Sequence, residues 1–252
     1  MAGLDAARPA ALVTGAGRLR GIAAGIVARL ADDGWDLALA SWRHDAPGAQ
    51  PSSADEPERI ADDARARGAT VVVIQADLSD PAEPERVVAE AAAALGPLRG
   101  MVLAHAESRR SAVLDTTVAS FDRHMAVNAR SSWQLIAAFA RQATGGGSIV
   151  ALTSGATEGE LPYAASKAAL DRIVVATAHE LGPQGIRANL VDPGPIDTGW
   201  MDDALRAELV KEQPTGRLGT PADIAKVVSF LLSEDGAWTT GQHIHSDGGF
   251  ST

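Results

Sequence analysis

The sequence predicts a single α/β domain in which helices cover both faces of a parallel, doubly wound sheet. Strand-length apolar segments alternate with helical segments along the chain, and this alternation is typical of a parallel sheet with crossover helices. A glycine-containing turn joins the first strand to the first helix, as in the nucleotide-binding Rossmann fold. A length of 252 residues suits one large domain.

The predicted strands are short apolar runs bounded by turn residues. They cover residues 10–13, 35–40, 71–75, 101–105, 148–152, 187–191 and 242–245. The predicted helices have apolar residues at helical spacing. The first ends near residue 30, one begins at residue 163, and the others cover residues 58–67, 84–95, 120–142 and 221–232.

Two further segments have no core pattern. Residues 44–57 are rich in Pro, Ser, Ala and Gly, which predicts a loop. Residues 196–214 are expected to form a lid beside a ligand crevice, with Trp200 and Met201 as apolar contacts. We therefore expect one domain over residues 1–252, with a candidate substrate lid at 196–214.

The helix predicted at 120–142 carries a polar residue on its apolar face. Asn128 lies on that face with six other residues, which are Phe121, Met125, Ser132, Leu135, Ile136 and Phe139. A buried amide must be hydrogen-bonded. Asn128 therefore either fixes local structure or holds a water molecule.

Composition excludes several function classes. The formal net charge of -10 argues against nucleic-acid binding, which needs clustered cations. The absence of cysteine excludes disulfides and thiolate chemistry and suits a reducing compartment. The first residues lack a basic segment, and their apolar run has only strand length, so we expect neither a signal peptide nor a membrane span. The expected location is the cytoplasm.

The first turn has the residues of an anion site. The segment TGAGRLRGIA at residues 14–23 joins a strand to a helix, and backbone N–H groups at such a helix start can bind a pyrophosphate. The interval from Gly15 to Gly21 is wider than the usual fingerprint. An ordinary strand-to-helix turn is therefore the alternative.

The residues after the second strand indicate which dinucleotide is bound. Ser41, Trp42 and Arg43 contain no acid to accept from a ribose 2'-hydroxyl, whereas a cation can pair with a 2'-phosphate. Together with Arg18 and Arg20, Arg43 favours NADP(H) over NAD(H). Alternatively, these arginines are solvated surface residues.

Tyr163 and Lys167 are the strongest candidates for proton chemistry. They stand four residues apart in YAASK, so on a helix they share one face. Tyr163 is the only tyrosine in the chain. We expect the ammonium to lower the tyrosine pKa from its usual value of about 10. A solvated surface pair is the alternative for such a short motif.

Two further groups of polar residues lie at strand ends. Thr153 and Ser154 follow the fifth strand, where hydroxyls face the ligand crevice of a doubly wound sheet unless they are only turn residues. His243 and His245 share one face of the last strand, but no third ligand is evident. The sequence therefore predicts no metal site.

The order of these motifs resembles the classical short-chain dehydrogenase/reductase family over essentially the whole chain. The match consists of TGAGRLRGIA, Asp77-Leu78, Asn128, Thr153-Ser154, YAASK, DPGPIDT and TGQHIHSDGG. The two extra residues before Gly21 resemble a branch labelled 3-oxoacyl-carrier-protein reductase-like, a label that fixes no substrate.

The resemblance implies a role for each matching residue. Tyr163 is the expected acid or base, Lys167 lowers its pKa and binds the nicotinamide ribose, Ser154 polarises the carbonyl, and Asn128 holds a water linking Lys167 to solvent. The implied cofactor contacts are Gly15, Arg18, Gly21, Ile22, Arg43, Asp77, Leu78, Ala104, Lys167, Pro193, Gly194, Ile196 and Thr198.

Three features of the sequence depart from the family pattern. Residues 104–107 read AHAE where the family usually has NNAG, at the expected adenine-ribose wall. Only nine positions separate Ser154 from Tyr163, a shorter interval than usual, which leaves Thr153 as an alternative carbonyl donor. Ala23 stands where glycine is common.

The sequence as a whole predicts an NADP(H)-dependent oxidoreductase that interconverts a ketone or aldehyde and an alcohol. The alternatives are a non-catalytic dinucleotide-binding homologue and an epimerase or dehydratase on the same scaffold. The expected partners are a small-molecule substrate and further copies of the chain, as a homotetramer or a dimer. Neither nucleic acid nor a membrane is expected as a partner.

Overall fold

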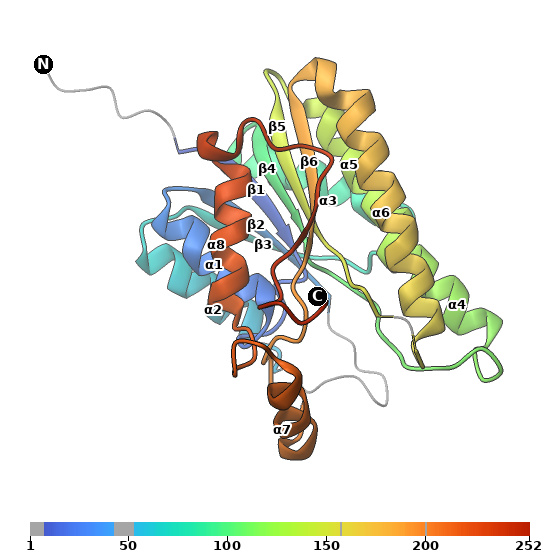
Figure 1. Cartoon of the computed structure of the whole chain (residues 1–252). Coiled ribbons are helices and arrows are strands. Elements are labelled where there is room, and N and C mark those ends of the chain that lie inside the picture. Colours follow the sequence, from blue (N-terminus) through green and yellow to red (C-terminus); the bar gives the residue numbers. More distant parts are fainter. Residues whose placement is uncertain (1–7, 43–52, 157, 200) are drawn as a thin grey trace, which may run out of the picture.

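The computed structural model describes residues 8–42, 53–156, 158–199 and 201–252, and one seven-stranded sheet runs through them (Figure 1). The strand order is β3-β2-β1-β4-β5-β6-β7, and every neighbouring pair is parallel. The order reverses between β1 and β4, where a doubly wound sheet opens a crevice at the carboxyl ends of its strands. The predicted fold class is confirmed.

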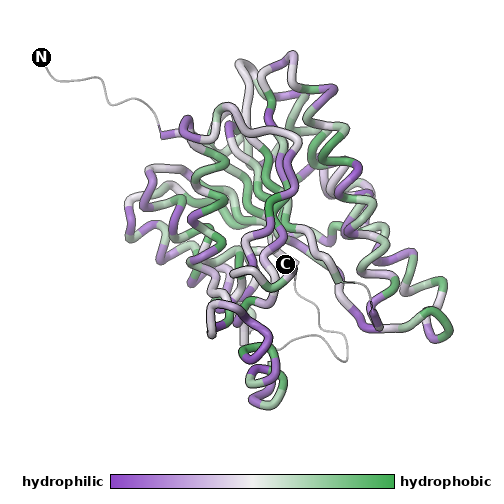
Figure 2. The backbone as a smooth tube through the Cα atoms, viewed as in Figure 1, coloured by the Kyte–Doolittle hydropathy of each residue, from purple (hydrophilic) through white to green (hydrophobic). Residues whose placement is uncertain are grey.

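The strands are close to the segments that the sequence predicts. They are β1 (Ala10–Thr14), β2 (Asp36–Ser41), β3 (Val71–Gln75), β4 (Leu98–Leu103), β5 (Gly147–Leu152), β6 (Ile186–Asp192) and β7 (His243–His245). The central strands are buried on both faces, and Figure 2 shows hydrophobic residues concentrated along them. Such continuous apolar runs are expected where helices cover both sides of a parallel sheet.

Two layers of helices enclose the sheet. One layer contains α1 (Ile22–Asp32), α2 (Glu56–Ala66) and α8 (Pro221–Leu232), and the other contains α3 (Glu83–Leu95), α5 (Ser131–Gln142) and α6 (Leu161–Leu181). Their buried side chains fall into two core clusters, one on each face of the sheet. None of the helices in the described segments is long and apolar enough to cross a membrane.

The helix predicted at 120–142 is interrupted by a π-helical segment. It consists of α4 (Val118–His124), a π-helix over Met125–Arg130, and α5. The wider turn rotates α4 relative to α5, so Phe121 does not share the buried face of Phe139 and is 36% exposed. The prediction of one uninterrupted apolar face is wrong at this point. π-helical turns occur often at functional sites.

The segment 196–214 contains a helix that the sequence did not predict. This helix, α7 (Asp203–Glu212), has no buried residue and projects from the body of the domain (Figure 1). Asp202 caps its first turn by accepting from Leu205 N. Met201 is buried, whereas Trp200 lies outside the described residues. A capped but unburied helix is consistent with the missing core pattern.

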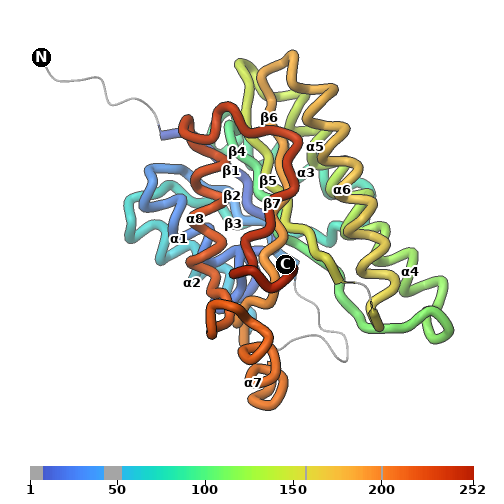
Figure 3. The backbone as a smooth tube through the Cα atoms, viewed as in Figure 1, coloured from blue at the N-terminus to red at the C-terminus, as the bar shows by residue number. Residues whose placement is uncertain are grey.

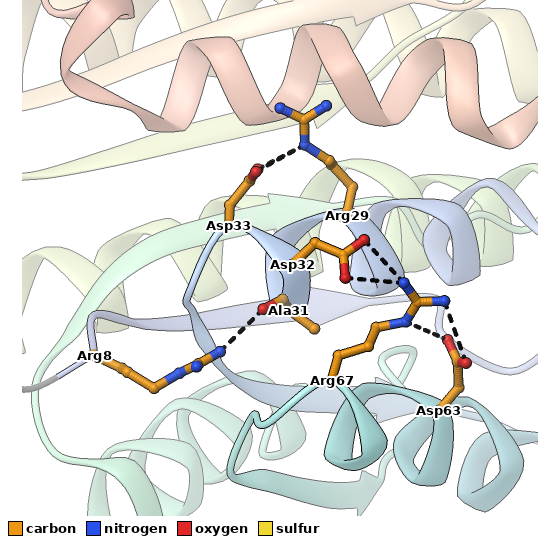
Figure 4. A network of polar contacts seen from close by, with 7 residues as sticks. All are labelled: Arg8, Arg29, Ala31, Asp32, Asp33, Asp63 and Arg67. Atoms are coloured by element: carbon orange, nitrogen blue, oxygen red, sulfur yellow. Dashed lines mark hydrogen bonds and ion pairs between the residues drawn. The ribbon is translucent and has the colours of Figure 1, made fainter.

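A network of ion pairs joins the ends of α1 and α2 (Figure 4). Arg67 lies between two carboxylates, with its Nη1 2.9 Å from Asp32 and its Nε 2.9 Å from Asp63. Arg8 donates to the backbone oxygen of Ala31 at 3.0 Å. These contacts hold the two helices together at the amino end of β1 and β2, away from the crevice.

Candidate active site

Several residues of the predicted site lie at the carboxyl ends of β1, β4, β5 and β6. Thr14, Ala104, Thr153 and Pro193 are at or just beyond these ends. Since parallel strands end at the same edge of the sheet, side chains far apart in sequence meet there. The structure thus brings the predicted site residues to one edge.

The first turn fits an anion. Gly15 has a φ of +78°, and a Cβ there would lie 2.7 Å from the backbone oxygen of Ala104, so only glycine allows this approach. Gly21 is the N-cap of α1 and has no side-chain capping bond. The N–H groups of this helix start therefore have no side-chain acceptor at the cap, as a pyrophosphate site requires.

Arg18 and Arg20 bond to the segment that follows β6. Arg18 donates to the backbone oxygen of Thr198 at 3.1 Å, and burial lowers its pKa. Arg20 pairs with Asp197 at 3.4 Å. These contacts join the first turn to the candidate lid. Arg43, the other cation expected at a 2'-phosphate, lies outside the described residues.

Lys167 is buried on α6, one turn after Tyr163. Its Nζ donates to the backbone oxygen of Leu152 at 2.8 Å and lies 5.7 Å from the centroid of the Tyr163 ring. Burial lowers the pKa of Lys167 to about 8, although the nearby carboxylates of Asp171 and Asp192 oppose this change. The lysine therefore loses its proton more readily than an exposed one.

The expected effect of Lys167 on the tyrosine is wrong. Burial raises the pKa of Tyr163 to about 12, and a hydrogen bond with Ser154 only partly opposes this. The charges of Glu160 and Asp192 raise it further. Removing the phenolate from water costs more than the neighbouring groups recover, so Tyr163 keeps its proton at neutral pH.

The structure separates the two hydroxyls that the sequence left as alternatives. Thr153 donates to the carboxylate of Asp171. Ser154 forms a hydrogen bond with Tyr163 and accepts one from Ala156 N at 3.2 Å. Ser154 is therefore the hydroxyl beside the tyrosine.

Asn128 lies in the π-helical segment and is fully buried. Its Oδ1 accepts from Glu107 N at 2.7 Å, and its Nδ2 donates to Glu107 O at 2.9 Å and to Ser166 Oγ at 2.8 Å. Ser166 in turn donates to the backbone oxygen of Tyr163. The side chain of Asn128 thus fixes the chain after β4 against α6.

His105 contributes contacts that the sequence did not reveal. Its Nδ1 lies 2.7 Å from Thr14 Oγ1, and its Nε2 lies 3.0 Å from the backbone oxygen of Val127. A carbonyl only accepts, so we assign the proton to Nε2. Burial lowers the pKa of His105 to about 3, with a further contribution from Lys167. A neutral imidazole therefore joins β1 to the π-helix.

Glu107 is the second unexpected residue in this loop. It is 7% exposed and pairs with Arg123 at 2.9 Å and with Arg109 at 3.2 Å. Arg123 also lies 3.8 Å from Asp77, a predicted cofactor contact. Sixteen residues separate Glu107 from Arg123, so no local pattern could reveal the pair. In the sequence, the departure from NNAG at residues 104–107 was the only indication that this loop differs from the family pattern.

The other predicted cofactor contacts are near the crevice but differ in exposure. Leu78 and Ile196 are buried in the two core clusters. Gly194 has a φ of +60°, and a Cβ there would lie 2.5 Å from Asp247 Cβ, so glycine is required. Its N–H donates to Asp192 Oδ1 at 3.0 Å. Thr198 is also buried.

Comparison with known proteins shows extensive similarity. The family model described as enoyl-(acyl carrier protein) reductase matches residues 15–251. The uncharacterized oxidoreductase YjdA of Bacillus subtilis (strain 168) is 34% identical over 248 residues, covering 95% of this chain and 96% of that protein. A chloroplastic NADPH-dependent aldehyde reductase-like protein of Arabidopsis thaliana is 32% identical over 253 residues, covering 95% of this chain and 93% of that protein.

A solved structure shares the fold over almost the whole chain. It is the blue fluorescent protein from a metagenomic library in complex with NADPH. The TM-score is 0.86 with 33% sequence identity, and the match covers 97% of this chain and 98% of that one.

Proposed function

The chain belongs to the short-chain dehydrogenase/reductase family and is an oxidoreductase of that family, and we propose that it uses NADP(H) to interconvert a ketone or aldehyde and the corresponding alcohol. The observation that carries this proposal is the hydrogen bond between Ser154 and Tyr163, at the strand edge where Lys167 is buried. A hydroxyl donor and a proton source side by side are what a carbonyl reduction requires.

The cofactor would lie across the carboxyl ends of β1 and β4. The uncapped start of α1 at Gly21 suits its pyrophosphate. Gly15, Ile22 and Ala104 would border the phosphates, with Asp77 and Leu78 near the adenine. Pro193, Gly194, Ile196 and Thr198 would border the nicotinamide, and Lys167 its ribose.

Two kinds of support favour NADP(H) over NAD(H). The segment after β2 lacks the acid that would bind a ribose 2'-hydroxyl, and it contains Arg43. The Arabidopsis relative is named as an NADPH-dependent aldehyde reductase-like protein, and the structure of the metagenomic blue fluorescent protein was solved in complex with NADPH. Arg18 is bonded to Thr198, so we propose that Arg43 is the more important cation for the 2'-phosphate.

The chain's own residues would manage the proton. When bound, the cofactor would supply or accept the hydride. Tyr163, with its pKa near 12, is protonated at neutral pH and would deliver its proton to the substrate oxygen. Ser154 would donate to the same oxygen as negative charge develops on it. Lys167, held by Leu152 O, would position the ribose.

Two further parts of the proposal concern the surroundings of the site. The segment 196–214 would shape the substrate pocket, because it is joined to the first turn through Arg18 and Thr198. We also propose a homo-oligomer, because α4 and its surroundings expose large apolar side chains, which are Val113, Leu114, Val118, Phe121 and Trp133. Light scattering after size-exclusion chromatography tests the oligomer, and a monomer would contradict it.

The test of the proposed function is a titration of the purified protein with NADPH and with NADH, followed by nicotinamide fluorescence. We expect saturable binding of NADPH, at least about tenfold tighter than NADH, because one charge-assisted contact to the 2'-phosphate is worth that much. A panel of aldehydes and ketones should then oxidise NADPH. Absence of binding by either nucleotide would contradict the proposed function. Binding without NADPH oxidation would favour the non-catalytic dinucleotide-binding homologue, or an epimerase or dehydratase.

A further inference from the structure

The last strand carries two histidines beside a buried carboxylate. β7 lies beside β6 (Figure 3) and is parallel to it, with His245 opposite Asp192 and His243 opposite Leu190. His243 and His245 are two residues apart on a strand, so both point to the same side. Asp192 points to that side as well, because directly opposite residues of paired strands share a face.

The three side chains are close enough to share one ion. One ligand atom from each of Asp192, His243 and His245 can be chosen so that all three lie within 4.8 Å of one another. His245 Nδ1 lies 3.8 Å from Asp192 Oδ2. Ligands of a tetrahedral ion at its usual bond lengths lie about 3.4 Å apart. The exposed imidazoles would have to rotate to reach that geometry.

The two imidazoles are already arranged side by side. Their ring centroids are 4.7 Å apart, and the rings are inclined by only 10°. Because an imidazole nitrogen binds a metal in the plane of its ring, the two stacked rings must tilt toward each other to share one ion. Both side chains are exposed, so binding would order groups that have few other contacts.

Asp192 has one carboxylate oxygen for such a role. Its Oδ1 accepts from Gly194 N at 3.0 Å, whereas no described residue donates a hydrogen bond to Oδ2. The residue is 6% exposed, and its Oδ2 lies 3.8 Å from His245 Nδ1. A cation bound at Oδ2 would therefore lie between the carboxylate and an imidazole.

Solvent reaches this group from one side. His245 lines an open pocket of about 230 Å³, together with Arg217, Ser246 and Asp247. This opening exposes His245, one of the three candidate ligands, to solvent. Ser251 Oγ lies 3.2 Å from His245 Nδ1, so a hydroxyl lies beside the nitrogen that faces Asp192.

We propose that Asp192, His243 and His245 form a binding site for a divalent transition-metal ion, with Zn²⁺ as the best match. Two imidazoles and one carboxylate form the ligand set of three-residue zinc sites, whereas Mg²⁺ and Ca²⁺ prefer oxygen ligands throughout. The proposed hydride chemistry requires neither histidine. The expectation of no metal site arose because Asp192 is 51 residues before His243 in the sequence.

The test measures Zn²⁺ binding by isothermal titration calorimetry, with protein from which any histidine tag has been removed. We expect one Zn²⁺ per chain, with affinity reduced at least about tenfold in His243→Ala, in His245→Ala and in Asp192→Asn. His179→Ala is the matched control, because His179 is an exposed histidine on α6, and it should bind Zn²⁺ like the unchanged protein. Co²⁺ absorption spectra should show the same dependence on His243 and His245.

Two outcomes would overturn the proposal. One is the absence of Zn²⁺ binding at micromolar concentrations, which would leave His245 and Asp192 as a simple ion pair. The other is binding that is equally strong in His243→Ala and His245→Ala, which would locate the ion elsewhere. Circular dichroism of each variant separates loss of the ligand from loss of the fold. A rise in the melting temperature with Zn²⁺, absent in His243→Ala, is the second readout.

Discussion

The ammonium of Lys167 lies 5.7 Å from the centroid of the Tyr163 ring and donates its hydrogen bond to the backbone of Leu152. The lysine is thus held by β5, and the tyrosine is hydrogen-bonded to Ser154 at the end of the same strand. Burial nevertheless keeps the phenol protonated rather than ionised. It leads to predictions about activity and about pH.

Replacement of the tyrosine should abolish turnover. Tyr163→Phe removes only the phenolic oxygen, and loss of a general acid typically costs 10²- to 10⁴-fold in rate. NADPH oxidation with the best carbonyl substrate from the panel measures the loss. NADPH affinity, from nicotinamide fluorescence, should change by less than about threefold, because the proposed role of the hydroxyl is at the substrate oxygen.

The folding of this variant needs its own control. Tyr163→Phe should retain the melting temperature of the unchanged protein within a few degrees, because the ring stays in place. Turnover that persists at the original rate would show that another group supplies the proton.

Lys167 should make stability depend on pH. The pKa of Lys167 is about 8 in the folded protein, against its ordinary value of 10.5, so between these values the unfolded chain binds more protons. Stability therefore rises as the pH increases from 8 toward 10.5 and falls as the pH decreases toward 8. The full effect is of the order of 3 kcal/mol. Urea unfolding at pH 8, 9 and 10 measures it.

The comparison with two variants isolates this contribution. In Lys167→Met, the free energy of unfolding should no longer rise between pH 8 and pH 10. In Lys211→Met, which replaces an exposed lysine on α7, this rise should remain. Measurements stop at pH 10, because the raised pKa of Tyr163 makes stability fall at higher pH, between about 10 and 12. An identical pH dependence in Lys167→Met and the unchanged protein would refute the assignment.

Elements with local signals could be predicted from the sequence. The ranges of β3 and α8 agree with the prediction at both ends. For α8 the reason is a capping box, in which Thr220 accepts from Asp223 N and Asp223 accepts from Thr220 N, followed by Pro221. The π-helical turn around Asn128 has no comparable local signal, because it depends on the contacts of Asn128 with Glu107 and Ser166.

The candidate site was predictable where it depends on strand ends. Ser154 and Gly194 follow buried strands, and parallel strands bring such positions together. The Glu107–Arg123 pair and the approach of Asp192 to His245 depend on tertiary structure, so they were missed. The predicted direction of the pKa shift of Tyr163 was wrong. The spacing of Tyr163 and Lys167 along a helix indicates a neighbouring charge, but it does not indicate how deeply the tyrosine is buried.

Gly25 should be essential for the packing of α1 on α8. A Cβ there would lie 2.6 Å from Pro221 Cβ and 2.8 Å from its backbone carbon. Gly25→Ala gains about 1 kcal/mol of helix propensity, but overpacking costs about 1 to 3 kcal/mol. We expect a net loss of up to about 2 kcal/mol in the free energy of unfolding, measured in urea.

Gly182 provides the matched control for this substitution. Its φ is −52°, and a Cβ there would meet no atom within 4 Å. Gly182→Ala should leave stability unchanged or raise it by up to about 1 kcal/mol. Equal effects of Gly25→Ala and Gly182→Ala would argue against the close contact of α1 with Pro221.

The two hydroxyls after β5 should differ in their effect on catalysis. Ser154→Ala removes the group beside Tyr163, and loss of one donor to a developing oxyanion costs about 10²- to 10³-fold in kcat. Thr153→Val removes a hydrogen bond to Asp171 instead. Its main effect should therefore be on the free energy of unfolding rather than on kcat. Steady-state kinetics and urea unfolding of both variants test this separation. A larger loss of kcat in Thr153→Val than in Ser154→Ala would assign the carbonyl donor to Thr153, because only the donor acts directly on the reacting oxygen.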